Sequence, residues 1–348
     1  MPVLGRQASR PGATWIYGPA TDLFVALCWV PMWLLAHQLV RGHGGHDDAL
    51  LRSALGAAFL LSFLHQPLTL ALVYGDANQL RQHRRLFLWT PPAAIGLIIV
   101  AVAFHLWVII PVAAVWNTVH TLQQRYGLCR IYSRKAHYGS ALVDRWMLFA
   151  SMAAAVLAVA VNHATLRLVH RVNLDGVNAG GIRLLVDARP WAVALLVPVG
   201  LVAAGLLAAI VRQEAAQGSR ANPAKWIYQG SSLLLIASIA VDPAAGFIAY
   251  IGAHALEYFV VVYKTFDARY GRERDGSTVL GLVAHRWAGR VAAIAVVVGA
   301  ALLLRARVHG DVYNVVLYTV GVLHFVYDGV IWKLRKPVVA ADFAIRPA

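Results

Sequence analysis

Four histidines lie inside long apolar segments of this chain, where polar side chains are uncommon. They are His65, His120, His254 and His324, each in a different segment. At about 1.5 Å of helix rise per residue, three of them are expected roughly 15 Å from one end of their segments, and His120 a little nearer that end. Neutral imidazole binds transition metals, and it also forms hydrogen bonds between helices. Four histidines at comparable depth favour convergence on a shared metal site over four separate hydrogen bonds.

Acidic side chains follow two of these histidines at helical spacing. Glu257 comes three residues after His254, and Asp328 comes four residues after His324. Residues three or four apart lie on one face of a helix. Metal-bound histidines usually donate their second N–H to a carboxylate or carbonyl. We therefore predict that Glu257 and Asp328 are metal ligands or orienting partners of the histidines.

Amide and phenol side chains surround the same positions. Asn117 and Gln124 flank His120 at helical spacing, and we expect them to support the metal ligands without binding the metal. Tyr258 and Tyr327 each stand next to a predicted site residue. With Glu257 and Asp328, these two tyrosines are the candidates for contact with the reacting molecule.

The composition predicts an all-α, polytopic transmembrane bundle. Hydrophobic residues make up 59% of the 348 residues and charged residues only 14%, against about 25% in soluble domains. Ten apolar segments are expected to be helices: 21–40, 50–74, 87–108, 110–131, 141–162, 189–211, 227–241, 243–264, 288–305 and 312–333. The segments 227–241 and 243–264 meet at a turn dipeptide, so they are either two full spans or one re-entrant pair.

Lysine and arginine alternate between rich and poor loops along the chain. The rich loops include Arg81, Arg84 and Arg85; Arg134 and Lys135; and Lys333, Arg335 and Lys336. The positive-inside rule then places both termini in the cytoplasm, with a cytoplasmic segment 1–20, a bundle 21–336 and a cytoplasmic tail 337–348. The longest outer loop contains a stretch, 166–170, that is expected to lie as a short interfacial helix.

The formal net charge of +15 suits basic loops on an anionic membrane surface better than nucleic-acid binding. Membrane lipid is therefore the expected partner, and no nucleic acid is expected. We predict an integral protein of the bacterial cytoplasmic (inner) membrane. The two cysteines, Cys28 and Cys129, are too few for a disulfide framework or a thiolate metal site.

The last apolar segment carries a resemblance to a known family. The stretch 323–337, LHFVYDGVIWKLRKP, resembles the last helix of the Brp/Blh family of membrane β-carotene 15,15'-dioxygenases, which also has a histidine, an aspartate shortly after it and a basic end. The iron of that family is thought to be held by histidines from several helices. The resemblance implies that His65, His120, His254 and His324 hold iron here, and that the substrate is a carotenoid or a related lipophilic molecule.

Two main hypotheses follow. The first is a membrane-embedded non-haem metal oxidoreductase or dioxygenase that acts on a carotenoid, isoprenoid or lipid. Its metal is one or two iron ions, or another transition metal, and a separate electron donor is needed unless the reaction is a dioxygenation. The alternative is a proton- or ion-coupled transporter with Glu257 and Asp328 as protonation sites. A third hypothesis is a non-catalytic membrane scaffold.

Overall fold

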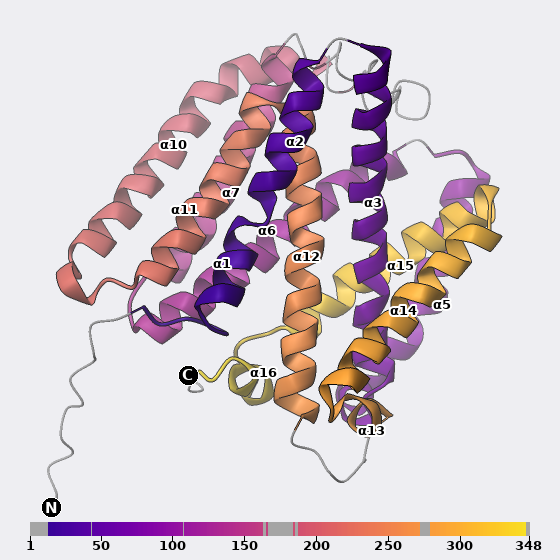
Figure 1. Cartoon of the computed structure of the whole chain (residues 1–348). Helices are drawn as coiled ribbons and strands as arrows, with labels where there is room; N and C mark the ends of the chain where they lie inside the picture. The colour runs from indigo at the N-terminus through magenta and orange to yellow at the C-terminus, as the bar shows by residue number, and fades with distance from the viewer. Residues whose placement is uncertain are drawn as a thin grey trace, which may run out of the picture.

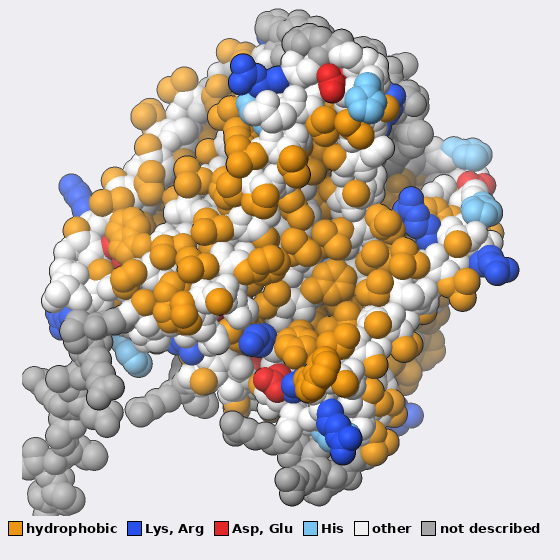
Figure 2. Space-filling view, viewed as in Figure 1, with side chains coloured by type: hydrophobic (Ala, Val, Ile, Leu, Met, Phe, Trp, Pro, Cys, Tyr) orange, Lys and Arg blue, Asp and Glu red, His pale blue; other side chains and the backbone are white. Residues whose placement is uncertain are grey.

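The computed structural model describes residues 13–42, 44–106, 108–162, 165, 184, 187–271 and 279–345. Within these ranges all regular elements are helices and none is a strand, which confirms the all-α prediction. Nine of the described helical stretches are long and apolar enough to cross a membrane. Hydrophobic side chains cover the middle of the face seen in Figure 2, and Lys and Arg lie mostly toward its ends. These features are consistent with an integral membrane protein.

The described helices follow one another along the chain in the order shown in Figure 1. They are α1 (Pro19–Leu27), α2 (Trp29–Arg41), α3 (Gly45–Tyr74), α4 (Ala77–Gln82), α5 (Arg84–Ala103), α6 (Ile109–Ala136), α7 (Ala141–Val161), α10 (Arg189–Ala215), α11 (Pro223–Val241), α12 (Pro243–Tyr270), α13 (Val279–Ala284), α14 (Trp287–Arg307), α15 (Gly310–Ile331) and α16 (Pro337–Asp342), with a 3-10 turn at Gly218–Arg220.

Each of the ten predicted segments coincides with helix in the structure. The first is formed by α1 and α2 together, which make one candidate span, Pro19–Arg41. The fourth, α6, is not among the nine candidate spans, because polar and basic residues from Asn117 onward lower its hydropathy. The seventh, α11, begins at Pro223 and reaches 19 residues, so both α11 and α12 are long enough to be full spans.

Side-chain caps explain the break between α11 and α12. Asp242 ends α11 and starts α12, where its carboxylate accepts from the backbone N–H of Ala245 at 3.1 Å. Proline follows at the first helical position, where no backbone donor is needed. Asn222 caps α11 in the same way, accepting from Ala224 N–H at 3.2 Å. A capping side chain followed by proline therefore marks the first residue of each of these two helices.

The central element of the bundle is α12 (Figure 1). In its most apolar window 78% of the residues are buried, against 6% in α10 and in α14 at the edges. Small residues let neighbouring helices come close to α12. A Cβ on Gly246 would lie 2.5 Å from the Cα of Ile239, and one on Gly252 would lie 2.7 Å from the sulfur of Met32. The glycines thus allow α11 and α2 to pack directly on the helix that carries His254.

The start of α1 and the helix α16 lie at the same end of the bundle, the lower end in Figure 1. The predicted tail 337–348 includes α16, which is tied to α12 by two hydrogen bonds from Arg269 Nε and Nη2 to Asp342, at 2.9 and 2.7 Å. The predicted interfacial stretch 166–170 and residues 1–12 of the N-terminal segment lie outside the described residues. The cytoplasmic location of this end stays a prediction.

Candidate metal centre

The four histidines come together in the interior of the bundle, each from a different helix. His65 lies on α3, His120 on α6, His254 on α12 and His324 on α15. The Nε2 atoms of His65 and His324 are 3.2 Å apart. The ring centroid of His254 lies 4.8 Å from that of His65 and 5.2 Å from that of His120. The convergence expected from the sequence is therefore present.

The cluster is shielded from solvent. His254 and His324 are fully buried, His65 is 1% exposed, and the His120 side chain is 9% exposed. Within each of two groups of three residues, the candidate ligand atoms lie within 4.8 Å of one another, and the groups share His324. The groups are His65, His254 and His324, and His120, His324 and Asp328.

Asp328 is the carboxylate that accompanies the histidines. Its Oδ2 lies 3.7 Å from Nε2 of His120 and 3.8 Å from Nε2 of His324. Its Oδ1 accepts hydrogen bonds from the hydroxyls of Thr69, at 2.8 Å, and Tyr258, at 2.9 Å. One oxygen is thus held by the protein, and the other faces the histidine rings.

Thr69 fixes the tautomer of His324. Its hydroxyl lies 2.7 Å from Nδ1 of His324, and its single hydrogen goes to Asp328. With that hydrogen on Asp328, the hydroxyl oxygen accepts from Nδ1–H of His324 and contacts the Tyr258 hydroxyl at 2.5 Å, which leaves the lone pair of Nε2 directed toward His65 and Asp328. This arrangement matches the partner that metal-bound histidines usually have on their second nitrogen.

Several nitrogen atoms of the cluster are buried without a hydrogen bond. Neither ring nitrogen of His254 has a partner among the described residues, and Nε2 of His120 has none either. Buried polar atoms without partners are rare and costly in folded proteins. A cation bound between the rings would take one lone pair from each ring, so the residues present fit a metal ion, although the N–H of His254 still has no acceptor among the described residues.

Glu257 does not join the histidines, although helical spacing predicted that it would. Its Oε1 accepts from Nη2 of Arg125, and its Oε2 accepts from Gln124 at 3.2 Å and Tyr228 at 3.3 Å. Arg125 and Glu257 are both fully buried, and Arg125 also donates to Ser232 at 3.0 Å. Both oxygens of Glu257 are therefore occupied, and its role as a metal ligand is not supported by this geometry.

The other predicted residues divide between the cluster and its surroundings. Tyr258 contacts the site through Asp328, and its ring centroid lies 5.1 Å from that of His324. Tyr327 points away, with its hydroxyl 2.7 Å from that of Tyr74 and donating to the carbonyl of Phe87 at 3.1 Å. Gln124 donates to Glu257, as described, and also to the backbone carbonyl of His254 at 3.4 Å.

Asn117 lies on α6, one turn before His120, and its Oδ1 is buried without a hydrogen bond. The sequence-based interpretation missed Thr69 and Arg125. Thr69 carried no signal, because a single threonine in an apolar segment is ordinary. Arg125 did carry a signal. It falls inside the predicted apolar segment 110–131, at a depth where a buried carboxylate such as Glu257 needs a charged partner.

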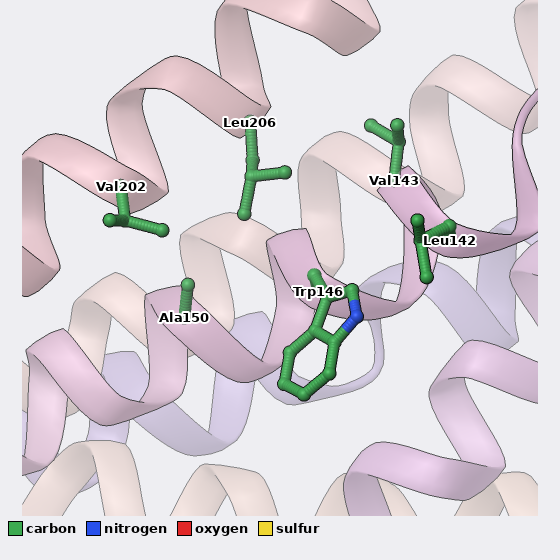
Figure 3. A pocket seen from close by; sticks show the side chains of 6 residues that line it. All are labelled: Leu142, Val143, Trp146, Ala150, Val202 and Leu206. Atoms are coloured by element: carbon green, nitrogen blue, oxygen red, sulfur yellow. The ribbon is translucent and has the colours of Figure 1, made fainter.

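Two cavities differ in what lines them. The smaller, about 250 Å³, lies between α7 and α10 and is lined by six hydrophobic side chains (Figure 3). The larger, about 540 Å³, is lined by His120, Tyr258 and Asp328 together with residues of α6, α7, α12, α15 and the C-terminal segment. His120 and Asp328, at the edge of the histidine cluster, therefore border a cavity large enough for a small molecule.

Comparison with known proteins adds no family to this description: no family model matches the chain, and neither do any curated protein sequences or solved structures.

Proposed function

We propose that this chain is a membrane-embedded metalloprotein that uses a non-haem transition metal, iron in the first instance, to oxidise a lipophilic small molecule. The observation that carries the proposal is His254. This fully buried ring stands between His65 and His120 with both nitrogens unpaired. An apolar residue would cost less at such a position unless a bound cation uses the lone pair of one of those nitrogens.

The donor set supports a transition metal over magnesium or calcium. His65, His254 and His324 offer three imidazoles on one side, and His120 and Asp328 add an imidazole and a carboxylate on the other. Imidazole ligands with one carboxylate suit iron, whereas magnesium and calcium prefer all-oxygen sites. The two groups share His324, which is compatible with one ion or two. When bound, iron would supply the redox change needed to activate dioxygen.

The protein's own residues would orient and isolate this centre. Thr69 and Tyr258 hold Oδ1 of Asp328, so that Oδ2 remains directed at the histidines. The Arg125–Glu257 pair joins α6 to α12 directly behind His254 and leaves no net charge in the buried wall. The apolar helices around the cluster keep bulk water away from an oxidising centre.

The transporter hypothesis finds less support. It requires Glu257 and Asp328 to exchange protons during a transport cycle. Glu257 is held by an ion pair with Arg125 and two further hydrogen bonds, so proton exchange at this carboxylate would require these contacts to break. Of the two predicted protonation sites, only Asp328 faces the larger cavity.

The test is the metal content of detergent-purified protein, measured by elemental mass spectrometry after reconstitution with iron. We expect near-stoichiometric metal in the native chain. We expect loss of that metal in a His254→Ala/His324→Ala variant and in the gentler Asp328→Asn variant. A His83→Ala/His285→Ala variant removes two histidines outside the cluster and should keep the metal.

Size-exclusion profiles establish that each variant is folded before its metal is measured. Absence of metal from the reconstituted native protein would overturn the proposal. So would retention of metal in folded His254→Ala/His324→Ala protein. In either case, flux measurements in liposomes would then test the transporter hypothesis.

A further inference from the structure

We infer that the larger cavity binds an amphiphile whose anionic headgroup sits at the basic end of the bundle and whose apolar chain reaches toward the histidines. The inference rests on the proposed metal centre in one respect only, namely that the deep end of the cavity lies at that centre. The binding itself is carried by the shape, lining and charge of the cavity.

The cavity follows one face of α6 from the cluster toward the helix end. His120 lines its deep end and Arg134 its far end, and both lie on α6. Fourteen residues of helix separate them, a rise of about 21 Å at 1.5 Å per residue. Between these points the walls are largely apolar and include Leu128, Val261 and Phe325. A chain-like molecule fits such a space better than a compact one.

The charges on the lining are separated along the cavity. Asp328 is the one acidic residue among the described lining residues, and it stands at the deep end. Arg134 and the exposed Lys333 stand at the other end. Arg130 is neutralised by Asp144 at 2.9 Å, whereas Arg134 donates only to the carbonyl of Leu334, at 3.0 Å. Two cationic groups without an acidic partner in the described structure thus face a ligand's headgroup.

The position of these cations fits a headgroup at a membrane surface. Helix α6 ends at Ala136 and α15 ends at Ile331, so Arg134 and Lys333 lie where both helices leave the bundle. Lipid headgroups occupy this level, and basic side chains there attract anionic ones. The apolar part of the cavity lies deeper, at the level of lipid chains.

Two helical glycines line the cavity. A Cβ on Gly127 of α6 or on Gly329 of α15 would meet nothing within 4 Å. A larger side chain at either position would therefore project into the cavity. Gly299 on α14 is a matched position, since a Cβ there is also unobstructed but lies outside the cavity lining.

The experiment uses dibromostearate, a carboxylate whose bromine atoms quench tryptophan fluorescence on contact. Trp116 and Trp332 line the cavity and report on its occupancy. The full chain in a non-ionic detergent is titrated with the acid, with its uncharged methyl ester, and with a phosphatidylglycerol that carries brominated chains. We expect saturable quenching by an anionic ligand and weaker binding of the ester. Saturation by the free acid alone or by the phospholipid alone identifies which source supplies the anionic amphiphile.

Variants locate the binding. Gly329→Leu fills the cavity and should weaken binding about tenfold or more, whereas Gly299→Leu should leave it unchanged. Lys333→Gln should weaken binding of the anion about two- to fivefold without affecting the ester, and the neighbouring Arg335→Gln should not. Metal content is measured on the same samples, and we expect it to be unchanged in Gly299→Leu, Lys333→Gln and Arg335→Gln.

Equal affinity for the acid and the ester would overturn the inference, and so would unchanged quenching in Gly329→Leu protein. These results leave the metal content untouched and therefore differ from failure of the proposed metal centre. That failure would appear as metal-free protein whether or not the amphiphile binds.

Discussion

Replacing Thr69 by valine tests whether His324 is held in place for metal binding. Valine has nearly the shape of threonine but lacks the hydroxyl. That hydroxyl lies 2.7 Å from Nδ1 of His324 and donates to Oδ1 of Asp328 at 2.8 Å. Asp328 would keep its hydrogen bond from Tyr258, at 2.9 Å. The change therefore falls mainly on His324, whose Nδ1–H would lose its acceptor in a fully buried place.

The expected magnitude follows from this geometry. A buried donor left without an acceptor costs about 1–3 kcal/mol. In the metal-bound form Nδ1 must carry the proton, because Nε2 is the atom that faces the cluster, so that form bears the whole penalty. Without metal, the proton can move to Nε2 and be shared with His65, 3.2 Å away. At about 1.4 kcal/mol per factor of ten, metal affinity should fall about 10- to 100-fold.

The assay is an equilibrium competition between the purified protein and a chelator of known metal affinity. Thr69→Ser restores a hydroxyl and should recover most of the lost affinity. Thr118→Val is the matched control on α6, because the Thr118 hydroxyl donates only to the carbonyl of Ala114 in its own helix. Metal affinity of Thr69→Val equal to that of Thr69→Ser and Thr118→Val would refute this account of the site.

Three further predictions concern the surroundings of the cluster. Arg125→Met leaves Glu257 buried without its cation and should lower the free energy of unfolding by about 3–5 kcal/mol; Arg125→Met/Glu257→Leu should lower it much less, as thermal denaturation in detergent would show. Tyr258→Phe removes a hydrogen bond to Asp328 and should weaken metal binding in the chelator competition, whereas Tyr327→Phe, which loses contacts to Tyr74 and Phe87 only, should not. Chelation of the metal should lower the melting temperature, because a ligand present at 100 times its Kd stabilises the folded state by about 2.7 kcal/mol; equal melting temperatures with and without chelator would contradict a bound metal.

Much of the architecture could be predicted from hydrophobic patterning. Runs of about twenty apolar residues have one favourable structure in a bilayer, the helix, because every backbone N–H and C=O must be bonded internally. The same patterning placed one histidine on each of four helices. It did not show that the charge of Arg125 on α6 is compensated by Glu257, 132 positions later in the chain.

The sequence by itself determined that His65, His120, His254 and His324 lie on four apolar helices, since this depends only on composition and on position along each segment. Only the tertiary structure decided which acid accompanies them. Helical spacing put Glu257 and Asp328 at equivalent offsets from a histidine, but it says nothing about which neighbouring helix each carboxylate faces. Packing turned Glu257 toward Arg125 on α6 and Asp328 toward Thr69 on α3. Contacts between helices distant in sequence therefore separated a buried ion pair from the candidate metal centre.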